Sequence, residues 1–372
     1  MHKKKLLFIV NVDYSFVSFR LPIALAAIKQ GYEVHVACGI TDKKTMLESC
    51  GLIVHPLTLL RSSTGILSEL KTLKQLFIII KLVRPDIAHS INIKPVLYGN
   101  IISRFLRVPC RIASITGLGY VFIETGIKAK FIRVIIALLY RLALGGAKTV
   151  IFQNSSDRDM LKELGAIKPK QELFIRGSGV DLSLYPVLPE PKGAPVVMLI
   201  ARLLIHKGVY EFVKAAEIIK AQASNVRMVL VGNIDSGYLK SVTMQEINSW
   251  VNADIIEYWG YSTEVATTMS KSNIIVLPSY REGLPKTLIE AAACGRAVVT
   301  TDVPGCRDAI VPNETGLLVD VKSTSSLVNG IFSLINNDDL RYKFAKNGRK
   351  LAERAFNIDD VVSMHLSIYD KE

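Results

Sequence analysis

The chain has 372 residues, which suggests about two domains, and 49% of them are apolar, so two packed cores can be filled. Its five cysteines include no Cys-x-x-Cys pair, which argues against a disulfide framework or a zinc site and favours a reducing compartment. The net charge of +13 lies in the first half: residues 1–186 hold 26 Lys and Arg against 12 Asp and Glu, and residues 187–372 hold 20 against 21. A basic half favours an anionic partner such as phospholipid, a lipid-linked diphosphate or nucleic acid.

The chain begins with a basic tip that leads into a predicted β-strand over Leu6–Val10. Such a start has the look of a signal peptide, but its apolar run is too short and no small-residue cleavage site follows. No other stretch reaches the roughly 18 uncharged apolar residues that a membrane-spanning helix needs. We therefore expect a cytoplasmic protein that does not cross the membrane.

Apolar, β-rich runs alternate with segments of helical periodicity through the rest of the first half. The further predicted strands are Glu33–Ala37, Ile87–His89, Arg111–Ile115 and Thr149–Gln153. The predicted helices lie near Leu21–Lys29, Leu67–Val83, Val96–Phe105 and Lys128–Leu144. This alternation is typical of the α/β class, with a parallel sheet covered by helices on both faces.

Prolines and a glycine cluster at Val187–Pro195, and this composition predicts a linker. The second half has predicted strands at Val196–Ile200, Met228–Val231, Ile255–Trp259, Ile274–Leu277 and Ala297–Thr300. Its predicted helices are Val209–Ala221, Lys286–Cys294, Ser325–Ile335 and Leu340–Ala355. We expect two domains, 1–186 and 187–356, with a C-terminal helix over about 357–372 that returns to the first. A ligand cleft is expected between them, at the carboxyl ends of both sheets.

The densest functional signal is SYREGLPKTLIEAAACG, at residues 279–295. This segment follows the predicted strand Ile274–Leu277 and opens a helix. Glu282 is therefore expected in the loop at the carboxyl end of the strand, and Glu290 more than one turn into the helix. Free backbone N–H groups around residues 283–286 would carry the positive end of the helix dipole, which suits a diphosphate.

A second signal is ARLLIHKG, at residues 201–208. Arg202 directly follows the predicted strand Val196–Ile200, and Lys207 stands at the start of the next helix. Two cations at neighbouring strand ends can clamp a diphosphate, Arg as a planar fork and Lys as a point charge. Because a departing diphosphate gains negative charge, fixed cations and amides would stabilise it during the reaction.

With these residues the chain resembles the retaining glycosyltransferases of family 4, whose GT-B fold has two Rossmann-like parallel-sheet domains that face a cleft. The resemblance rests on the patterns strand–Arg–x4–Lys–Gly and Glu–x7–Glu. It covers the second half closely and the first half by its layout. Three segments are similar to the bacterial enzymes that add N-acetylgalactosamine to undecaprenyl-diphosphate-linked sugars: VMLIARLLIHKGVYEF, VLPSYREGLP and TGLGYVFIETGIKAKFIRVII.

The resemblance implies a UDP-sugar donor and a set of residues that bind it: Arg202, Lys207, Glu282, Gly283, Leu284, Pro285 and Glu290. Arg202 and Lys207 would hold the diphosphate, and Glu282 would contact the donor-sugar hydroxyls; these three would take part in catalysis. Glu290 would accept hydrogen bonds from the uridine ribose. The family keeps the donor's α configuration, and the leaving phosphate takes the acceptor proton, so no carboxylate nucleophile is expected. No metal cofactor is expected either, because fixed cations can replace a metal.

Candidates for acceptor binding lie in the first half. His89 ends a predicted strand and is either an acceptor ligand or a hydrogen-bonded structural histidine. Arg20, Asn92 and Lys94 are further candidates. The segment 12–20, read as the loop after the first strand, contains no glycine, unlike many family members, so close backbone approach to the donor is not expected there.

The segment Lys128–Lys148 carries five basic residues and no acid among apolar residues at near-helical spacing. This pattern is typical of a basic amphipathic helix on an anionic bilayer surface. For a second basic and apolar segment, Leu70–Arg84, we expect burial in the core instead.

The sequence thus predicts a hexosyltransferase on the inner face of the cell membrane. It would move N-acetylgalactosamine or a related hexosamine from a UDP-sugar to a polyprenyl-diphosphate-linked saccharide in surface-glycan biosynthesis. One alternative is a UDP-sugar epimerase of the same fold, which would not need a lipid acceptor. The isoelectric point of 9.4 suggests another, a nucleic-acid-binding protein. That alternative requires aromatic residues among the basic ones, whereas the basic stripe here carries aliphatic residues.

Overall fold

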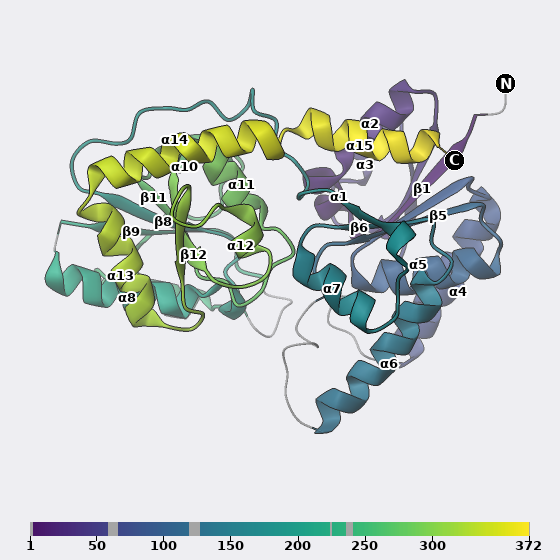
Figure 1. Ribbon diagram of the computed structural model, residues 1–372, viewed down its shortest axis with the longest axis horizontal. Helices are drawn as coiled ribbons and strands as arrows, with labels where there is room; N and C mark the ends of the chain where they lie inside the picture. The colour runs from purple at the N-terminus through teal and green to yellow at the C-terminus, as the bar shows by residue number, and fades with distance from the viewer. Residues whose placement is uncertain (1–2, 59–65, 119–126, 224, 236–240, 372) are drawn as a thin grey trace. The chain divides into compact units, whose positions relative to one another are not determined.

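The computed structural model describes residues 3–58, 66–118, 127–223, 225–235 and 241–371, with the backbone alone for residues 66 and 127–132. The chain divides into two compact units, each built on one parallel β-sheet (Figure 1). The first unit comprises Met1–Ser178 together with Ile358–Glu372, and the second comprises Gly179–Asn357. The expected α/β class with two parallel sheets is therefore confirmed.

The sheet of the first unit has seven strands in the order β3-β2-β1-β4-β5-β6-β7. Their bounds are β1 Lys5–Val12, β2 Glu33–Gly39, β3 Ile53–Pro56, β4 Ile87–Ile91, β5 Cys110–Ile115, β6 Thr149–Phe152 and β7 Glu172–Phe174. The strand order turns back between β1 and β4, which is the position where ligands bind in open parallel sheets. All five predicted strands of this half are confirmed, and β3 and β7 extend the two edges.

The helices of the first unit are α1 Asp13–Phe19, α2 Leu21–Lys29, α3 Lys44–Ser49, α4 Ile66–Val83, α5 Ile93–Phe105, α6 Ile127–Leu144, α7 Ser155–Glu163 and α15 Ile358–Asp370. Successive residues of β1 face opposite layers, as the twofold period of a strand requires. Leu6 and Phe8 pack with residues of α2 and α15, whereas Leu7 and Ile9 pack with residues of α4. The two helical layers thus cover opposite faces of the sheet.

One segment of the first unit differs from the sequence-based expectation. Residues 12–20, read as a loop, contain the short helix α1, whose first residue Asp13 is fully buried. The Asp13 carboxylate accepts hydrogen bonds from the backbone N–H groups of Thr41 and Lys43, so contacts distant in sequence hold this helix. The C-terminal helix α15 packs against α2 (Figure 1). Its Tyr369 side chain is buried in the core of the first unit.

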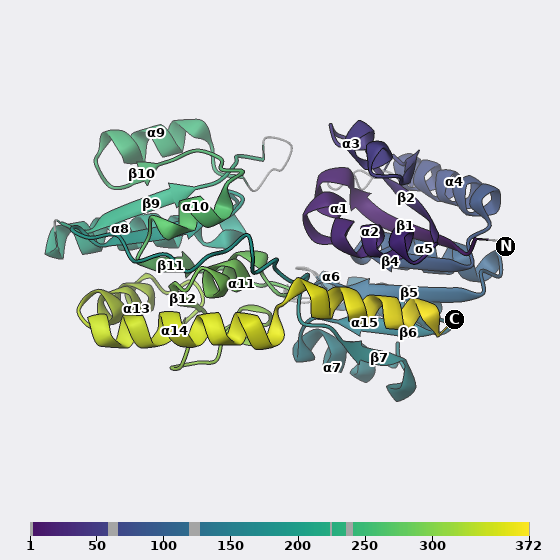
Figure 2. The same ribbon diagram turned by 90° about the horizontal axis from the view of Figure 1, so that it is seen from above.

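The sheet of the second unit has six strands in the order β10-β9-β8-β11-β12-β13. Their bounds are β8 Val196–Ile200, β9 Arg227–Val231, β10 Glu257–Tyr258, β11 Ile274–Leu277, β12 Ala297–Thr301 and β13 Gly316–Val319. The helices are α8 Val209–Gln222, α9 Met244–Asn252, α10 Val265–Ser270, α11 Lys286–Ala293, α12 Cys306–Ala309, α13 Thr324–Ile335 and α14 Asp338–Ala355. Helices α8 and α13 pack side by side on one face (Figures 1 and 2), while α10 and α11 cover the other.

The segment Val187–Pro195, predicted as a linker, instead lies along the second unit. The carboxylate of Glu190 forms an ion pair with Arg341 at 2.9 Å, and both side chains are buried. The guanidinium of Arg296 donates hydrogen bonds to the carbonyls of Leu188 and Pro189. The chain therefore passes between the units at residues 178/179 and 357/358, compared with the expected positions of 186/187 and about 356/357.

Candidate active site

The loops that follow β8, β11 and β12 meet at the carboxyl ends of these neighbouring strands. The backbone N–H of Tyr280 donates to the carbonyl of His206 at 2.9 Å and so joins the first two loops. The N–H of Glu282 donates to the carbonyl of Pro304 at 3.2 Å and joins the second loop to the third. These contacts set the side chains of three separate sequence segments around one point.

Two glycines allow this close approach. At Gly208, with φ of +76°, a Cβ would lie 2.2 Å from the carbonyl oxygen of Pro278. At Gly305, with φ of +81°, a Cβ would lie 2.5 Å from the carbonyl oxygen of Glu282. Both the left-handed backbone and the lack of space require glycine. The glycine that follows Lys207 in the sequence pattern thus serves to bring the loops together.

Lys207 and Glu282 form the centre of this arrangement. The ammonium of Lys207 forms an ion pair with Oε1 of Glu282, and the hydroxyl of Ser279 donates to the same oxygen at 2.7 Å. The two charged side chains are only 15% and 13% exposed. The structure therefore brings together two of the predicted catalytic residues, which lie 75 positions apart in the sequence.

Arg202, the third predicted catalytic residue, lies at the rim. Its side chain is 47% exposed, and its guanidinium pairs with the carboxylate of Asp235 at 3.4 Å rather than with Glu282. An exposed pair of this kind contributes about 0–1 kcal/mol, so Arg202 can exchange partners readily. Asp235 was not singled out from the sequence, although it follows β9 as Arg202 follows β8.

Glu290 lies within α11 and is almost fully buried. Its Oε1 accepts a hydrogen bond from the hydroxyl of Tyr185 at 2.7 Å, and the ammonium of Lys286 lies at 3.5 Å. Burial raises the pKa of the Glu290 carboxyl, and the charge of Lys286 opposes that rise. Tyr185 is 105 positions away in the sequence, so no local pattern could have identified it as a partner.

The loop residues before α11 contribute mainly backbone groups to the candidate site. The side chain of Leu284 is buried in the core of the second unit. Pro285 is the N-cap of α11, and no side chain caps this helix. Gly283 lies between Glu282 and Leu284, in the loop that approaches Gly305. The uncapped start of α11 at Lys286 fits the predicted anion-binding helix terminus.

The four predicted acceptor residues of the first unit do not form one group. His89 is fully buried, with Nδ1 at 2.8 Å from the hydroxyl of Tyr369 and Nε2 at 2.7 Å from the hydroxyl of Ser114. Burial, together with the charges of His365 and Arg20, lowers the pKa of His89. Because both ring nitrogens have partners inside the core, this placement supports the structural role of His89.

Arg20, at the junction of α1 and α2, is also buried, and its Nε has no hydrogen-bond partner among the described residues. Burial lowers the pKa of Arg20 to about 10. Asn92 is the N-cap of α5, and Lys94 lies in its first turn. The Asn92 side chain accepts a hydrogen bond from the hydroxyl of Thr116, and the Lys94 ammonium pairs with Glu69 at 2.7 Å.

The basic segment Lys128–Lys148 forms most of α6. Its side chains up to residue 132 lie outside the described residues, and from Arg133 onward two faces are distinct. One face buries Tyr140 and Leu144 in a core cluster shared with α5. The other exposes four apolar side chains, Val134, Ile135, Leu138 and Leu142.

In the described part of the chain, no group of three or more His, Cys, Asp or Glu side chains is placed to hold a metal ion. Among the helices described, none is both long enough and apolar enough to cross a bilayer.

The chain is similar in sequence to known proteins over almost its whole length. The family model for glycosyl transferases group 1 matches residues 184–351, and the model for glycosyl transferase 4-like domains matches residues 5–154. A similar curated protein is the N,N'-diacetylbacillosaminyl-diphospho-undecaprenol alpha-1,3-N-acetylgalactosaminyltransferase of Campylobacter jejuni. It is 30% identical, and the match covers 98% of each chain.

Two solved structures show the same fold at low identity. Sucrose-phosphate synthase of Thermosynechococcus elongatus has a TM-score of 0.80 at 20% identity and covers 99% of each chain. HepE of Anabaena, in complex with UDP and glucose, has a TM-score of 0.78 at 17% identity and covers 100% of each chain. The expected GT-B fold with two Rossmann-like units is therefore confirmed.

Proposed function

The chain belongs to the group 1 glycosyltransferases, and from this premise we propose that it transfers a hexosamine from a UDP-sugar to a polyprenyl-diphosphate-linked saccharide with retention of the α configuration. The name of the Campylobacter jejuni relative supports N-acetylgalactosamine as the sugar and diphospho-undecaprenol as the carrier. The UDP in the Anabaena structure supports a uridine nucleotide as the leaving group. The reaction would serve the synthesis of a surface glycan.

The pairing of Lys207 with Glu282 at the carboxyl ends of the strands is the observation that carries this proposal. A diphosphate that enters the site can take the place of Glu282 as the partner of the Lys207 ammonium. The Glu282 carboxylate is then free to accept hydrogen bonds from donor-sugar hydroxyls. Arg202 can leave the exposed pair with Asp235 and reach the same diphosphate.

The proposed reaction breaks the bond between the anomeric carbon and the oxygen of the β-phosphate. Negative charge then develops on the diphosphate, where Lys207, Arg202 and the uncapped start of α11 stabilise it. The acceptor hydroxyl attacks the same face of the sugar, and its proton passes to the leaving phosphate. No side chain acts as nucleophile, and fixed cations take the place of a metal ion.

The test is a donor screen with a synthetic polyprenyl-diphosphate sugar as the acceptor. We expect UDP release that depends on this acceptor, and a product heavier by one N-acetylhexosamine. Proton coupling at the new anomeric carbon should show the α configuration. A β linkage would contradict retention, and UDP release without acceptor and without transfer would favour the epimerase.

Replacing Glu290 by Gln is expected to weaken UDP binding by about tenfold without loss of stability. Gln is a weaker acceptor for the ribose hydroxyls than a carboxylate is. A carboxyl whose folded-state pKa is raised opposes folding above that pKa, and this cost disappears below the ordinary Glu range. The Gln variant should therefore match or exceed the wild-type free energy of unfolding at pH 7, with the difference vanishing near pH 4.

Calorimetric titration with UDP and urea unfolding at the two pH values measure these effects. The control is Glu217→Gln, an exposed position on α8 outside the site. Unchanged UDP affinity in the Glu290 variant would remove this residue from the donor site.

A membrane-facing role is proposed for the face of the first unit that carries α4, α5 and α6, which we name the α4–α6 surface. Helix α5 contacts both of the other helices. Exposed apolar side chains occur on all three: Leu67, Leu70, Ile78 and Leu82 on α4, Phe105 on α5, and Val134, Ile135, Leu138 and Leu142 on α6. Isolated exposed apolar residues are ordinary, but such a concentration on adjoining helices favours an apolar partner.

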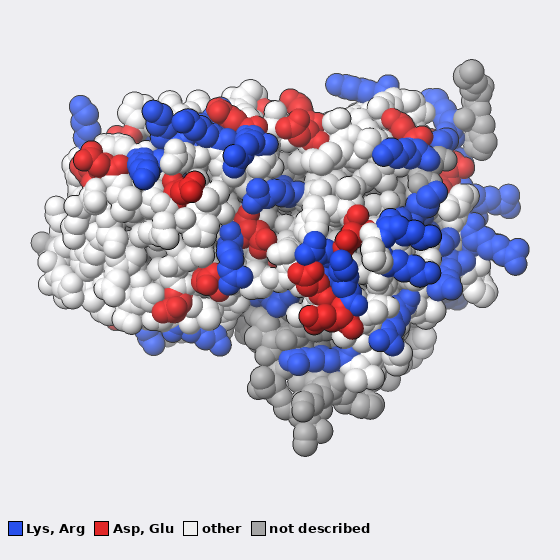
Figure 3. All heavy atoms as spheres, viewed as in Figure 1, with Lys and Arg blue, Asp and Glu red and all other residues white. Residues whose placement is uncertain are grey.

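Helix α4 is less buried than we expected for the segment Leu70–Arg84. Leu76 and Ile80 lie in the core as predicted, yet Leu82 is 73% exposed, and basic residues follow the same outer face. The exposed basic residues of α4 and α5 are Lys71, Lys74, Lys81 and Arg104, and Arg84 and Arg107 follow the ends of these helices. Lys and Arg are also prominent over the first unit in Figure 3. Apolar side chains flanked by cations fit the interface of an anionic bilayer.

Replacing Leu138 by Ser is expected to lower partition onto anionic vesicles by about tenfold, because burial of a Leu side chain contributes roughly 1.5–3 kcal/mol. The measurement is co-sedimentation with vesicles of phosphatidylglycerol and phosphatidylethanolamine at low and high salt. Leu184→Ser is the matched control, because Leu184 is exposed on the second unit. Equal binding of the two variants, or no dependence on salt, would contradict the α4–α6 surface.

A further inference from the structure

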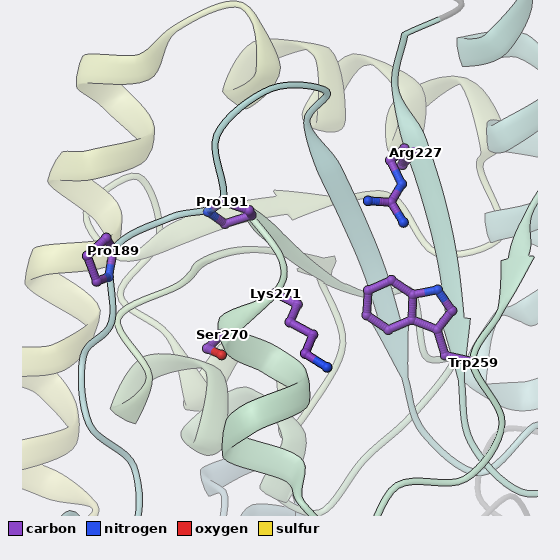
Figure 4. A pocket seen from close by; sticks show the side chains of 6 residues that line it. All are labelled: Pro189, Pro191, Arg227, Trp259, Ser270 and Lys271. Atoms are coloured by element: carbon purple, nitrogen blue, oxygen red, sulfur yellow. The ribbon is translucent and has the colours of Figure 1, made fainter.

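A pocket of about 470 Å³ lies within the second unit (Figure 4). The residues that line it are Pro189, Pro191, Arg227, Trp259, Ser270 and Lys271. They come from the segment along the second unit, the start of β9, the residue after β10 and the end of α10. We name this hollow the Trp259 pocket. Its volume lies within the range of ligand-binding pockets, about 300–1,000 Å³.

The Trp259 pocket is distinct from the proposed donor site. Arg227 is the first residue of β9 and stands opposite Val196, the first residue of β8. Lys271 lies just before β11. Arg227 and Lys271 therefore place one side of the pocket at the amino-terminal ends of β9 and β11, whereas Arg202 and Lys207 follow the carboxyl end of β8. A ligand bound here would not compete with the donor nucleotide.

The walls of the Trp259 pocket are flat and apolar. The indole of Trp259 is half-buried and supplies the largest surface, and the rings of Pro189 and Pro191 lie across the hollow (Figure 4). An aromatic face of this kind packs well against the C–H face of a flat ring. These surfaces are rigid already, so a ligand would lose little affinity to their ordering.

The two charged groups at the rim, those of Arg227 and Lys271, are hydrogen-bond donors. Only Arg227 has a carboxylate partner among the described residues. Arg227 forms two hydrogen bonds with the carboxylate of Glu257, at 2.6 and 2.7 Å. Glu257 also accepts the indole N–H of Trp259 at 3.0 Å, which holds the ring in place. Lys271 is exposed, and no carboxylate among the described residues pairs with it. In Figure 4 its side chain runs from α10 toward the indole.

We propose that the Trp259 pocket is a second carbohydrate site that binds a pyranose ring bearing one acidic group. The C–H face of the sugar packs against Trp259, and the acidic group pairs with the ammonium of Lys271. Because Lys and Arg can only donate hydrogen bonds, the ligand must be rich in acceptors, as hydroxyls and a carboxylate or phosphate are. A nucleobase edge, which mixes donors and acceptors, is matched less well.

The sequence offers a direct probe of this site, because the chain has only two tryptophans, Trp250 and Trp259. In the variant Trp250→Phe, all tryptophan fluorescence comes from Trp259. This protein would be titrated with trigalacturonate, with glucose 6-phosphate and with neutral maltotriose. We expect a saturable change in emission with an acidic sugar and none with maltotriose. Comparison of trigalacturonate with glucose 6-phosphate shows whether the site binds a glycan uronate or a free sugar phosphate.

Two variants decide whether the named side chains form the site. Lys271→Gln in the Trp250→Phe background should weaken acidic-sugar binding at least fivefold, whereas Lys214→Gln, an exposed control on α8, should not. In the reciprocal variant Trp259→Phe, the emission change should vanish. Equal responses to neutral and acidic sugars, no response to either acidic sugar at 10 mM, or an unaffected Lys271 variant would overturn the proposal.

The outcome is separable from that of the proposed transferase activity. Lys271→Gln should leave the rate of UDP release with a short acceptor unchanged, because Lys271 lies outside the donor site. If the chain transferred no sugar at all, the fluorescence titration would still report on the Trp259 pocket. Conversely, loss of pocket binding with full transferase activity would overturn this inference alone.

Discussion

Replacement of Lys207 by Ala is expected to lower kcat by about 10²–10³-fold, the loss that follows removal of one group that stabilises developing charge. The ammonium lies at the junction of the loops after β8 and β11, where we place the departing diphosphate. The same change should weaken UDP binding, because the cation meets the diphosphate in the ground state as well. Rates of sugar transfer under saturating donor, together with a UDP titration, measure both effects.

The loss must be separated from damage to the fold. Without Lys207, the Glu282 carboxylate remains in a site where it is only 13% exposed, and an unpaired charge there lowers stability. The double variant Lys207→Ala/Glu282→Gln removes that charge. It should recover most of the urea midpoint but none of the activity. Lys214→Ala on α8 is the matched control, and a wild-type rate in the Lys207 variant would remove the cation from the mechanism.

Replacement of Glu282 by Ala is expected to lower kcat by about 10²–10³-fold while leaving the affinity for UDP close to wild type. We assign its carboxylate to the hydroxyls of the transferred sugar and not to the nucleotide. UDP titration against transfer rates with the full donor therefore distinguishes this variant from the Lys207 variant. Ser279→Ala, which removes only one hydrogen bond to Glu282, should cost less than tenfold.

Equal losses of UDP affinity in the Glu282 and Lys207 variants would contradict this division of roles. Such a result would mean that the pair acts as one structural unit beneath the phosphates. Activity of the Ser279 variant as low as that of Glu282→Ala would point in the same direction. The three variants together thus test whether the carboxylate serves the sugar or only orients the cation.

The layout of the proposed donor site could be predicted from the sequence because its parts are local. The strand, loop and helix that hold Glu282 are contiguous, and Lys207 lies in the loop after another buried strand, β8. Carboxyl ends of neighbouring parallel strands share one edge of a sheet, so the two residues were expected to lie close together. Their direct ion pair was not predicted, nor was the pairing of Arg202 with Asp235, since side-chain partners across loops leave no periodic pattern.

The first unit was harder to predict for the same physical reason. The burial of His89 depends on Tyr369, 280 positions later in the chain. The helix α1 depends on Asp13, whose backbone partners lie about 30 residues away. Hydrophobic periodicity reports which residues face a core but not which distant residues complete it. It therefore placed five of the seven strands, missed β3 and β7 at the edges, and left the roles of His89 and Arg20 open.

The proline-rich composition of Val187–Pro195 did not predict that this segment belongs to the second unit. No helix or strand forms over Val187–Pro195, as the prolines predicted. They also left carbonyl groups without helical or strand partners, and the buried guanidinium of Arg296 uses two of these carbonyls. An irregular segment can therefore be a fixed part of a domain. This one supplies two walls of the Trp259 pocket.

The return of α15 to the first unit has a consequence for the order of folding during synthesis. The core of that unit includes Val361, Ile368 and Tyr369, so it cannot be completed when residues 1–178 leave the ribosome. Every residue of the second unit, 179–357, emerges before α15 does. The second unit is therefore the first whose complete sequence has left the ribosome, although most of the first unit is translated before it. Until α15 emerges, the first unit lacks the cover that this helix gives to part of one sheet face beside α2.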